Sequence, residues 1–262
     1  MDKNKTITIT VNDRPKFFKK ILSSLVNNSL HDWHIVVAVE PSKVRDEQLN
    51  LIKKFVPQAE VILNDSKLGV RENPFSVLNY VFEELNSKVN IYLEEDIIIS
   101  PDVCNLANWY YQAENRSACL CLCNSDTSGS KQINSTLFSP MNEAISRSCM
   151  FYPDEKRRTL QKRVGIGGHH GFSALGLVIK KYQWDNNFKD YWHSHTRGWD
   201  FGVHEQMLNQ SKQVLMPYIT RSDHIGTHGT HVGSAKANRK LGFGSLKLNS
   251  VIPNNYWVLQ TP

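Results

Sequence analysis

Three adjacent carboxylates interrupt an apolar stretch in the first half of the chain. They are Glu94, Glu95 and Asp96, between Ile91–Leu93 and Ile97–Ile99. Moving a carboxylate out of water is costly, and neighbouring like charges add to that cost. Mg²⁺ and Mn²⁺ prefer oxygen ligands, so the acids predict a metal site that binds phosphate in turn. The alternative is a strand that ends before solvated acids, but the immediate return to apolar sequence argues against it.

Asp200 is a second candidate for chemistry. It follows Trp199 and precedes a helix-like segment, so we expect it at a helix N-terminus, where the dipole favours an ionised carboxylate. Such a group can act as a general base. An ordinary N-cap is the alternative, and Glu205 is the nearest rival for the base.

The tail from Ser222 is rich in Gly and His. His224, His228 and His231 lie there together, and a zinc site is one interpretation, although the spacing does not match H-E-x-x-H. A loop that closes over a diphosphate, with a histidine or Arg221 facing phosphate, is favoured. A plain polar surface loop is the third possibility.

Strand and helix patterns alternate before these acids. Strands are expected at Lys5–Val11, His34–Glu40, Ala59–Leu63 and Val89–Asp96, and helices at Lys16–Asn28, Arg45–Phe55 and Asn73–Asn86. This order predicts an α/β fold with a mostly parallel sheet and helices on both faces. Ligands bind such sheets at the carboxyl ends of the strands, where Asn12–Arg14, Glu40 and Glu94–Asp96 fall.

The second half has a different pattern. Ser117–Asp126 and Phe172–Lys181 suggest strands, and Trp199–Lys212 suggests a short helix. The aromatic stretch Tyr182–Trp199 suits either sugar stacking or core packing. We expect one domain over residues 1–262, with a nucleotide-sugar-binding half (1–103) and a smaller, mixed acceptor-binding half (104–262).

The composition limits the environment and the partners. The net charge is +6, which favours anionic partners. There are five cysteines; Cys119, Cys121 and Cys123 alternate on one strand face and are expected to be buried small hydrophobes, with a metal site as the alternative. The N-terminus has no apolar signal region, and no segment is long enough to span a membrane. We therefore expect a soluble cytoplasmic protein with at most peripheral membrane association.

Several motifs, taken together, resemble a known family. "YLEEDIIISPD" (Tyr92–Asp102) looks like the metal-binding signature of GT-A glycosyltransferases, in particular the N-acetylglucosaminyltransferase I family. The other motifs are similar to that family's segments in the same order: "VNDRP" (Val11–Pro15), "GFSALGLVI" (Gly171–Ile179), "GWDFG" (Gly198–Gly202) and "MPYITRSDHIGTHG" (Met216–Gly229). The resemblance implies a GT-A fold, a UDP-sugar donor and Mn²⁺ or Mg²⁺.

The resemblance also implies residue roles. Asp96 would bind the metal directly, with His228 as a further ligand. Asp200 would be the catalytic base. The donor residues would be Thr10, Asn12 and Arg14 at the uridine, Glu40 at the uracil edge, and Glu94 and Glu95 at the donor sugar and ribose. In the position of Glu40 the family has Asp.

The expected function is inverting, metal-dependent transfer from a UDP-sugar, with UDP-GlcNAc as one possible donor, to a hydroxyl of a glycan or polysaccharide precursor. The partners are thus a nucleotide-sugar donor and a glycan acceptor, and no nucleic acid. Three alternatives remain. A nucleotidyltransferase would need a glycine-rich loop that "VNDRPKFF" lacks. A basic nucleic-acid-binding protein would have no use for buried acids. The third is an inactive carbohydrate-binding relative.

Overall fold

The structure is a computed structural model. It describes residues 3–123, 149–151, 172–210, 212–217, 220–226, 248 and 259–260, with backbone alone at 149–151 and 259–260. His228, expected as a metal ligand, and His231 lie outside the described residues.

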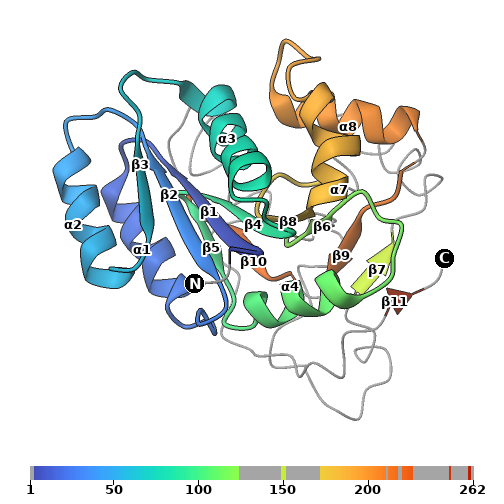
Figure 1. The fold of residues 1–262 in the computed structure, drawn as a ribbon, viewed down its shortest axis with the longest axis horizontal. Helices are drawn as coiled ribbons and strands as arrows, with labels where there is room; N and C mark the ends of the chain where they lie inside the picture. The colour runs from blue at the N-terminus through green and yellow to red at the C-terminus, as the bar shows by residue number, and fades with distance from the viewer. Residues whose placement is uncertain are drawn as a thin grey trace.

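Nine strands of the described residues form one mixed sheet, in the order β11–β7–β9–β6–β8–β4–β1–β2–β3 (Figure 1). Strand β1 is parallel to β2 and β4, and β2 is parallel to β3. Strand β8 runs antiparallel to β4 and β6. The bounds are β1 Lys5–Val11, β2 His34–Val39, β3 Glu60–Leu63, β4 Val89–Glu94, β6 Leu120–Cys121, β7 Cys149–Phe151, β8 Leu177–Lys180, β9 Leu215–Pro217 and β11 Leu259–Gln260. The expected α/β fold, mostly parallel in its first half and mixed in its second, is confirmed.

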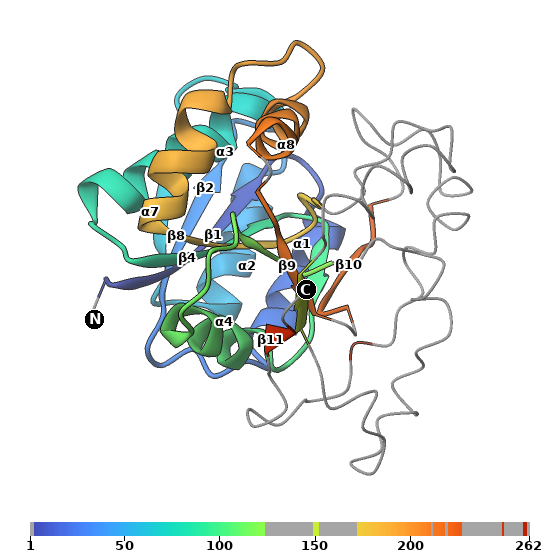
Figure 2. The same cartoon turned by 90° about the vertical axis from the view of Figure 1, so that its right-hand side faces the viewer.

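Helices cover both faces of this sheet (Figures 1 and 2). One face packs against α1 (Pro15–Leu25), α2 (Arg45–Phe55) and α4 (Val103–Gln112). The other packs against α3 (Gly69–Asn79), which continues as the π-helical turn η1 (Tyr80–Glu84), and against α7 (Lys181–Gln183), η3 (Trp184–Phe188), η4 (Lys189–Tyr191) and α8 (Trp199–Asn209). In α1 the side chains spaced for one helix face are fully buried: Phe18, Ile21, Leu22 and Leu25. Apolar periodicity of this kind is what predicted the helix.

A separate two-stranded sheet follows the acids. Strand β4 ends at Glu94. Glu95 and Asp96 form a turn, and a new strand, β5 (Ile97–Ile99), begins directly after this turn. Strand β5 pairs antiparallel with β10 (Ser222–His224), so that His224 lies opposite Ile97. The expected strand through Asp96 is therefore two residues too long. The pairing brings a late segment of the chain to the three acids.

A buried ion pair anchors that late segment. The Arg221 side chain is fully buried, and its Nη1 donates to Asp102 Oδ2 at 3.1 Å. Ser100 Oγ donates to Asp102 Oδ1 at 2.5 Å, and the Ser100 N–H donates to the Arg221 carbonyl at 2.9 Å. The prediction that Arg221 faces phosphate is thus wrong, because its guanidinium neutralises an aspartate at the start of α4.

Most of the aromatic stretch in the second half belongs to the core. Trp184, Phe188 and Trp192 are fully buried, whereas Tyr182 is exposed. The Trp192 and Trp199 rings stack with centroids 4.1 Å apart. Core packing therefore explains these buried rings, whereas Tyr182, at 46% exposed, lies at the surface.

The described cysteine side chains are free and buried. Burial raises the pKa of Cys123 to about 12, so its thiol stays protonated and packs as a small apolar group. This agrees with the interpretation of the alternating cysteines as hydrophobes. In the part of the chain that the structure describes, no helix has both the length and the apolar character needed to cross a membrane.

Candidate nucleotide-sugar and metal site

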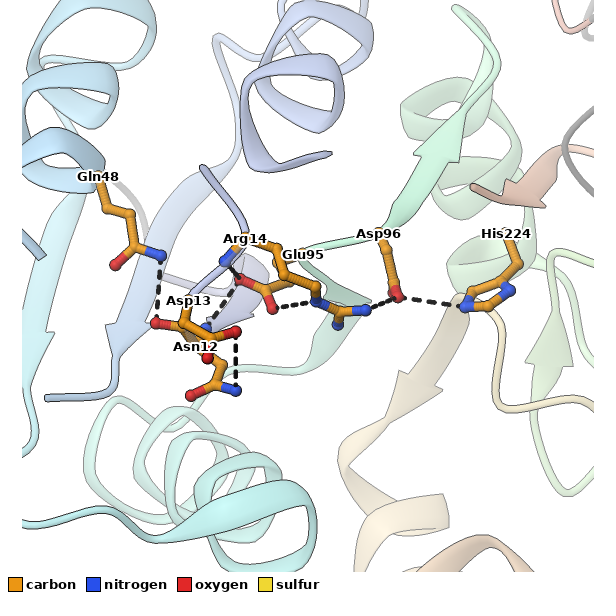
Figure 3. Close-up of polar contacts among 7 residues, drawn as sticks. All are labelled: Asn12, Asp13, Arg14, Gln48, Glu95, Asp96 and His224. Atoms are coloured by element: carbon orange, nitrogen blue, oxygen red, sulfur yellow. Dashed lines mark hydrogen bonds and ion pairs between the residues drawn. The ribbon is translucent and has the colours of Figure 1, made fainter. Parts of the chain in front are cut away.

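The carboxyl ends of β1 and β4 place the candidate residues side by side. Figure 3 shows a chain of polar contacts that runs from Gln48 through Asn12, Glu95, Arg14 and Asp96 to His224. Strand register produces this arrangement, because Thr10 pairs with Glu94 across the parallel β1–β4 ladder. The turns after both strands then meet at one edge of the sheet.

Glu95 holds the turn between β1 and α1. Its Oε2 accepts the backbone N–H of Asn12 at 2.9 Å and that of Arg14 at 3.3 Å. Its Oε1 accepts Arg14 Nε at 2.6 Å. The residue is only 2% exposed, so these contacts compensate a carboxylate that would otherwise be costly to bury.

Arg14 lies between two of the acids. Its Nε binds Glu95, and its Nη1 donates to Asp96 Oδ2 at 2.6 Å (Figure 3). Burial alone would lower the pKa of Arg14, but Asp96 and Glu95 outweigh it and raise that pKa above the ordinary value. The guanidinium is therefore the internal cation that makes the buried acids tolerable in the protein without ligands.

Asp96 retains one unused acceptor. Its Oδ2 contacts Arg14 and lies 3.2 Å from His224 Nε2, whereas its Oδ1 is buried and has no hydrogen-bond partner among the described residues. Burial alone would raise the pKa of Asp96, but His224 and Arg14 outweigh it and hold that pKa below its usual range. A buried, ionised oxygen without a partner is unusual in proteins and suits a cation.

Glu94 has a different environment from its neighbours. The Tyr92 hydroxyl donates to Glu94 Oε1 at 3.1 Å. Burial, reinforced by the negative charge of Asp96, raises the pKa of Glu94 to about 7. The three acids are thus not equivalent: Glu95 and Asp96 hold charges that are paired, and Glu94 is partly protonated at neutral pH.

His224 was expected in the histidine cluster, but the resemblance had pointed to His228 as the further metal ligand. The β5–β10 pairing carries His224 to the edge of the site, and the Ile225 N–H donates to the Asp96 carbonyl at 2.9 Å. Gly226 passes so close that a Cβ there would lie 2.3 Å from Asp96 Oδ2. The signal in the sequence was the cluster of histidines and glycines, which did not show which histidine meets the acids.

Asn12 and Gln48 extend the network away from Asp96. Gln48 Nε2 donates to the Asn12 carbonyl at 3.2 Å. Asn12 Oδ1 and Gln48 Oε1 are buried acceptors without a partner, so each could accept an N–H from a ligand. Thr10 lies deeper, with its hydroxyl 3.3 Å from the Tyr92 hydroxyl.

Glu40 is buried and makes structural contacts. Its carboxylate accepts the backbone N–H of Leu68 at 2.9 Å and that of Gly69 at 2.8 Å. Gly69 is the first residue of α3, and an anion at a helix N-terminus is favourable. A contact between Glu40 and a nucleobase stays a prediction.

Asp200 lies in the first turn of α8, as expected. The N-cap is Gly198, so the alternative of Asp200 as an ordinary N-cap does not hold. The ring of the preceding Trp199 meets the Tyr92 ring edge-on at 6.2 Å, and Tyr92 binds Glu94. The start of α8 is therefore packed against the strand that carries the acids, whereas Glu205 is exposed on the same helix.

The residues present fit a divalent cation. Asp96 Oδ1 is a hard oxygen ligand without a partner, and the imidazole of His224 lies beside the same carboxylate. Within the described residues no cluster of three or more His, Cys, Asp or Glu side chains is arranged to hold a metal. Mg²⁺-type sites commonly use one or two protein ligands and take the rest from substrate phosphates and water.

Solved structures that resemble this chain include proteins in complex with nucleotide sugars. TarS 1–349 from S. aureus, in complex with UDP-GlcNAc, has a TM-score of 0.56 and 12% identity, covering 88% of this chain and 61% of that one. The mannosyltransferase PcManGT from Pyrobaculum calidifontis, in complex with GDP-Man and Mn²⁺, has a TM-score of 0.50 and 10% identity, covering 88% and 60%. The chain thus spans about three fifths of the length of each.

At such low identity the likeness concerns the fold, which is of the GT-A type. No protein-family model matches the chain, and no curated protein matches it in sequence. The more specific resemblance to the N-acetylglucosaminyltransferase I family is not confirmed.

Proposed function

We propose that this protein is a metal-dependent, inverting glycosyltransferase. It would move a sugar from a UDP-sugar to a hydroxyl of a glycan or polysaccharide precursor. The observation that supports this most is the buried Oδ1 of Asp96, which has no partner among the described residues and lies at the carboxyl ends of the strands, where open α/β sheets bind ligands. The TarS structure with UDP-GlcNAc makes that compound the first donor to test.

Asp96 and His224 would hold Mn²⁺ or Mg²⁺. When bound, the cation would act as a Lewis acid that stabilises the charge developing on the departing diphosphate. His224 is the better-supported histidine, because its Nε2 lies 3.2 Å from Asp96 Oδ2, whereas His228 lies outside the described residues. Arg14 would place a second positive charge beside the phosphates.

The nucleoside would bind along Asn12 and Gln48. Uracil carries one ring N–H donor in its pairing edge, and Asn12 Oδ1 and Gln48 Oε1 are buried acceptors in need of such a donor. Thr10 would line the base of this pocket. Glu94, with its pKa raised to about 7 by burial and by Asp96, would donate a hydrogen bond to a donor-sugar oxygen in its protonated form.

Asp200 would act as the general base. A sugar hydroxyl is too weakly acidic to attack unaided at neutral pH, so a carboxylate must accept its proton in the transition state. The hydroxyl oxygen then bonds to the anomeric carbon as the bond to the diphosphate oxygen breaks. One such in-line displacement inverts the anomeric centre.

Thermal shift with UDP, GDP and their sugars, each with and without Mn²⁺, tests the class of protein. We expect UDP with Mn²⁺ to raise the free energy of unfolding by about 2.7 kcal/mol at roughly 100 times its Kd. The gain should vanish in Asp96→Ala and Asp96→Asn, each compared with its own ligand-free melting temperature. Asp32→Asn, an exposed aspartate before β2, is the control and should keep the full gain. A wild-type protein indifferent to every nucleotide would contradict the proposal.

A further inference from the structure

A groove lined by lysines runs along α1. It encloses about 590 Å³ between α1 and the β5 region. The lining residues that matter here are Lys16, Lys19, Lys20, Ser23, Asn27 and Ile98; we call this the lysine groove. A hydrogen bond from the Ile99 N–H to Ser24 Oγ at 3.2 Å holds β5 against α1 beneath it.

The lysine groove carries uncompensated positive charge. Lys16, Lys19 and Lys20 are exposed, and none of the described residues that line the groove carries a carboxylate. No ion pair joins these lysines to a carboxylate of the described residues. An anionic ligand would supply the missing countercharge.

These lysines are also poorly placed to stabilise their own helix. They lie in the first two turns of α1, whose first turn has no acidic residue, and cations near a helix N-terminus are unfavourable. In α2, by contrast, Asp46 and Glu47 lie in the first turn and Lys53 and Lys54 in the last. The charge pattern of α2 serves helix stability, and that of α1 does not.

The shape and chemistry of the groove favour a chain that carries phosphates. Lys16 to Ser23 spans roughly 10 Å along the axis of α1, longer than one sugar residue. The lysine ammonium is a compact point charge that binds phosphate well, whereas planar carboxylates are better matched by arginine. Ser23 and Asn27 add groups able to donate hydrogen bonds. A concave groove suits a discrete chain better than it suits a flat membrane surface.

The groove begins beside the candidate site. Lys16 is two residues from Arg14, and Ile98 is two residues from Asp96. We propose that the lysine groove binds an extended, phosphate-bearing chain, and, where the proposed function holds, that this chain is the glycan acceptor. A groove in this position would keep the bulk of a polyanionic acceptor on the α1 face while its end reaches the donor.

Binding of inorganic polyphosphate, followed by calorimetry at constant salt, tests this proposal. Lys19→Gln/Lys20→Gln should weaken binding roughly tenfold, as expected for the loss of two ion contacts. The matched control is Lys53→Gln/Lys54→Gln, which removes two adjacent exposed lysines from α2 and lowers the net charge equally. It should change the affinity less than about twofold.

Three results would overturn the proposal. The first is equal weakening in the two variants, which indicates non-specific attraction to net charge. The second is absence of polyphosphate binding by the wild-type protein. The third is loss of binding to anionic phospholipid vesicles in Lys19→Gln/Lys20→Gln with unchanged polyphosphate affinity, which indicates a membrane surface. UDP with Mn²⁺ is titrated into the same protein in parallel. If the proposed function fails and the groove proposal holds, the protein binds polyphosphate but does not respond to UDP with Mn²⁺.

Discussion

Asp200→Asn is expected to lose sugar transfer while it retains donor binding. The amide keeps the size of the side chain but cannot accept the proton of the attacking hydroxyl, and general-base catalysis contributes about 10²- to 10⁴-fold to rate. We therefore expect kcat to fall by that factor, with the UDP and Mn²⁺ thermal shift unchanged. Transfer from UDP-GlcNAc and other UDP-sugars to a panel of glycan acceptors provides the rate measurement.

The matched control for Asp200 lies on the same helix. Glu205 is exposed on α8, and Glu205→Gln makes the same carboxylate-to-amide change without removing the group at the start of the helix. It should keep transfer within about twofold of wild type, because surface substitutions away from a site usually have small effects. If instead Glu205→Gln loses transfer and Asp200→Asn keeps it, the base is Glu205.

Asp102→Asn should cause a large loss of stability. The substitution leaves the fully buried guanidinium of Arg221 without its carboxylate partner, and breaking a buried pair in this way costs about 3–5 kcal/mol. The loss is measured as the free energy of unfolding in urea. Because Arg221 immediately precedes β10, nucleotide binding should weaken as well.

The control for Asp102 is an aspartate in an exposed ion pair. Lys181 Nζ lies 2.6 Å from Asp185 Oδ1 on the surface, and Asp185→Asn should cost less than about 1 kcal/mol. Asp102→Leu combined with Arg221→Met should recover most of the stability, since apolar replacement of a whole buried pair is often neutral or better. Equal losses in Asp102→Asn and Asp185→Asn would show that the buried pair contributes no more than a surface one.

Much of the first half of the fold could be predicted because its signals are local. The strands β1 and β2 and the helices α1 and α2 follow from apolar periodicity, and β2 ends one residue before Glu40. The start of α3 was misplaced by four residues: the expected helix began at Asn73, whereas the helix begins at Gly69. The missing information was a tertiary contact, since the carboxylate of Glu40 binds the first N–H groups of that helix.

The part of the candidate site that could be predicted is the part at the carboxyl ends of the parallel strands. Arg14, Glu95 and Asp96 meet because β1 and β4 are parallel neighbours; the order of elements predicted that these strands are parallel, but not that they are adjacent. His224 reaches the same carboxylate through the β5–β10 pairing, which joins segments far apart in the chain. Such a pairing leaves no periodic trace in the sequence. The same limit applies to Arg221, because its place in the sequence before a glycine-rich segment does not reveal that its buried partner is Asp102.

The position of Arg14 affects how tightly the proposed metal ion would bind. The guanidinium contacts both carboxylates, so a divalent ion at Asp96 would bind acids whose charge Arg14 has already partly neutralised. The affinity for manganese would then be weaker than carboxylates without a neighbouring guanidinium would give. Truncating Arg14 to a neutral side chain would remove its positive charge from the acids, so the affinity for manganese should rise.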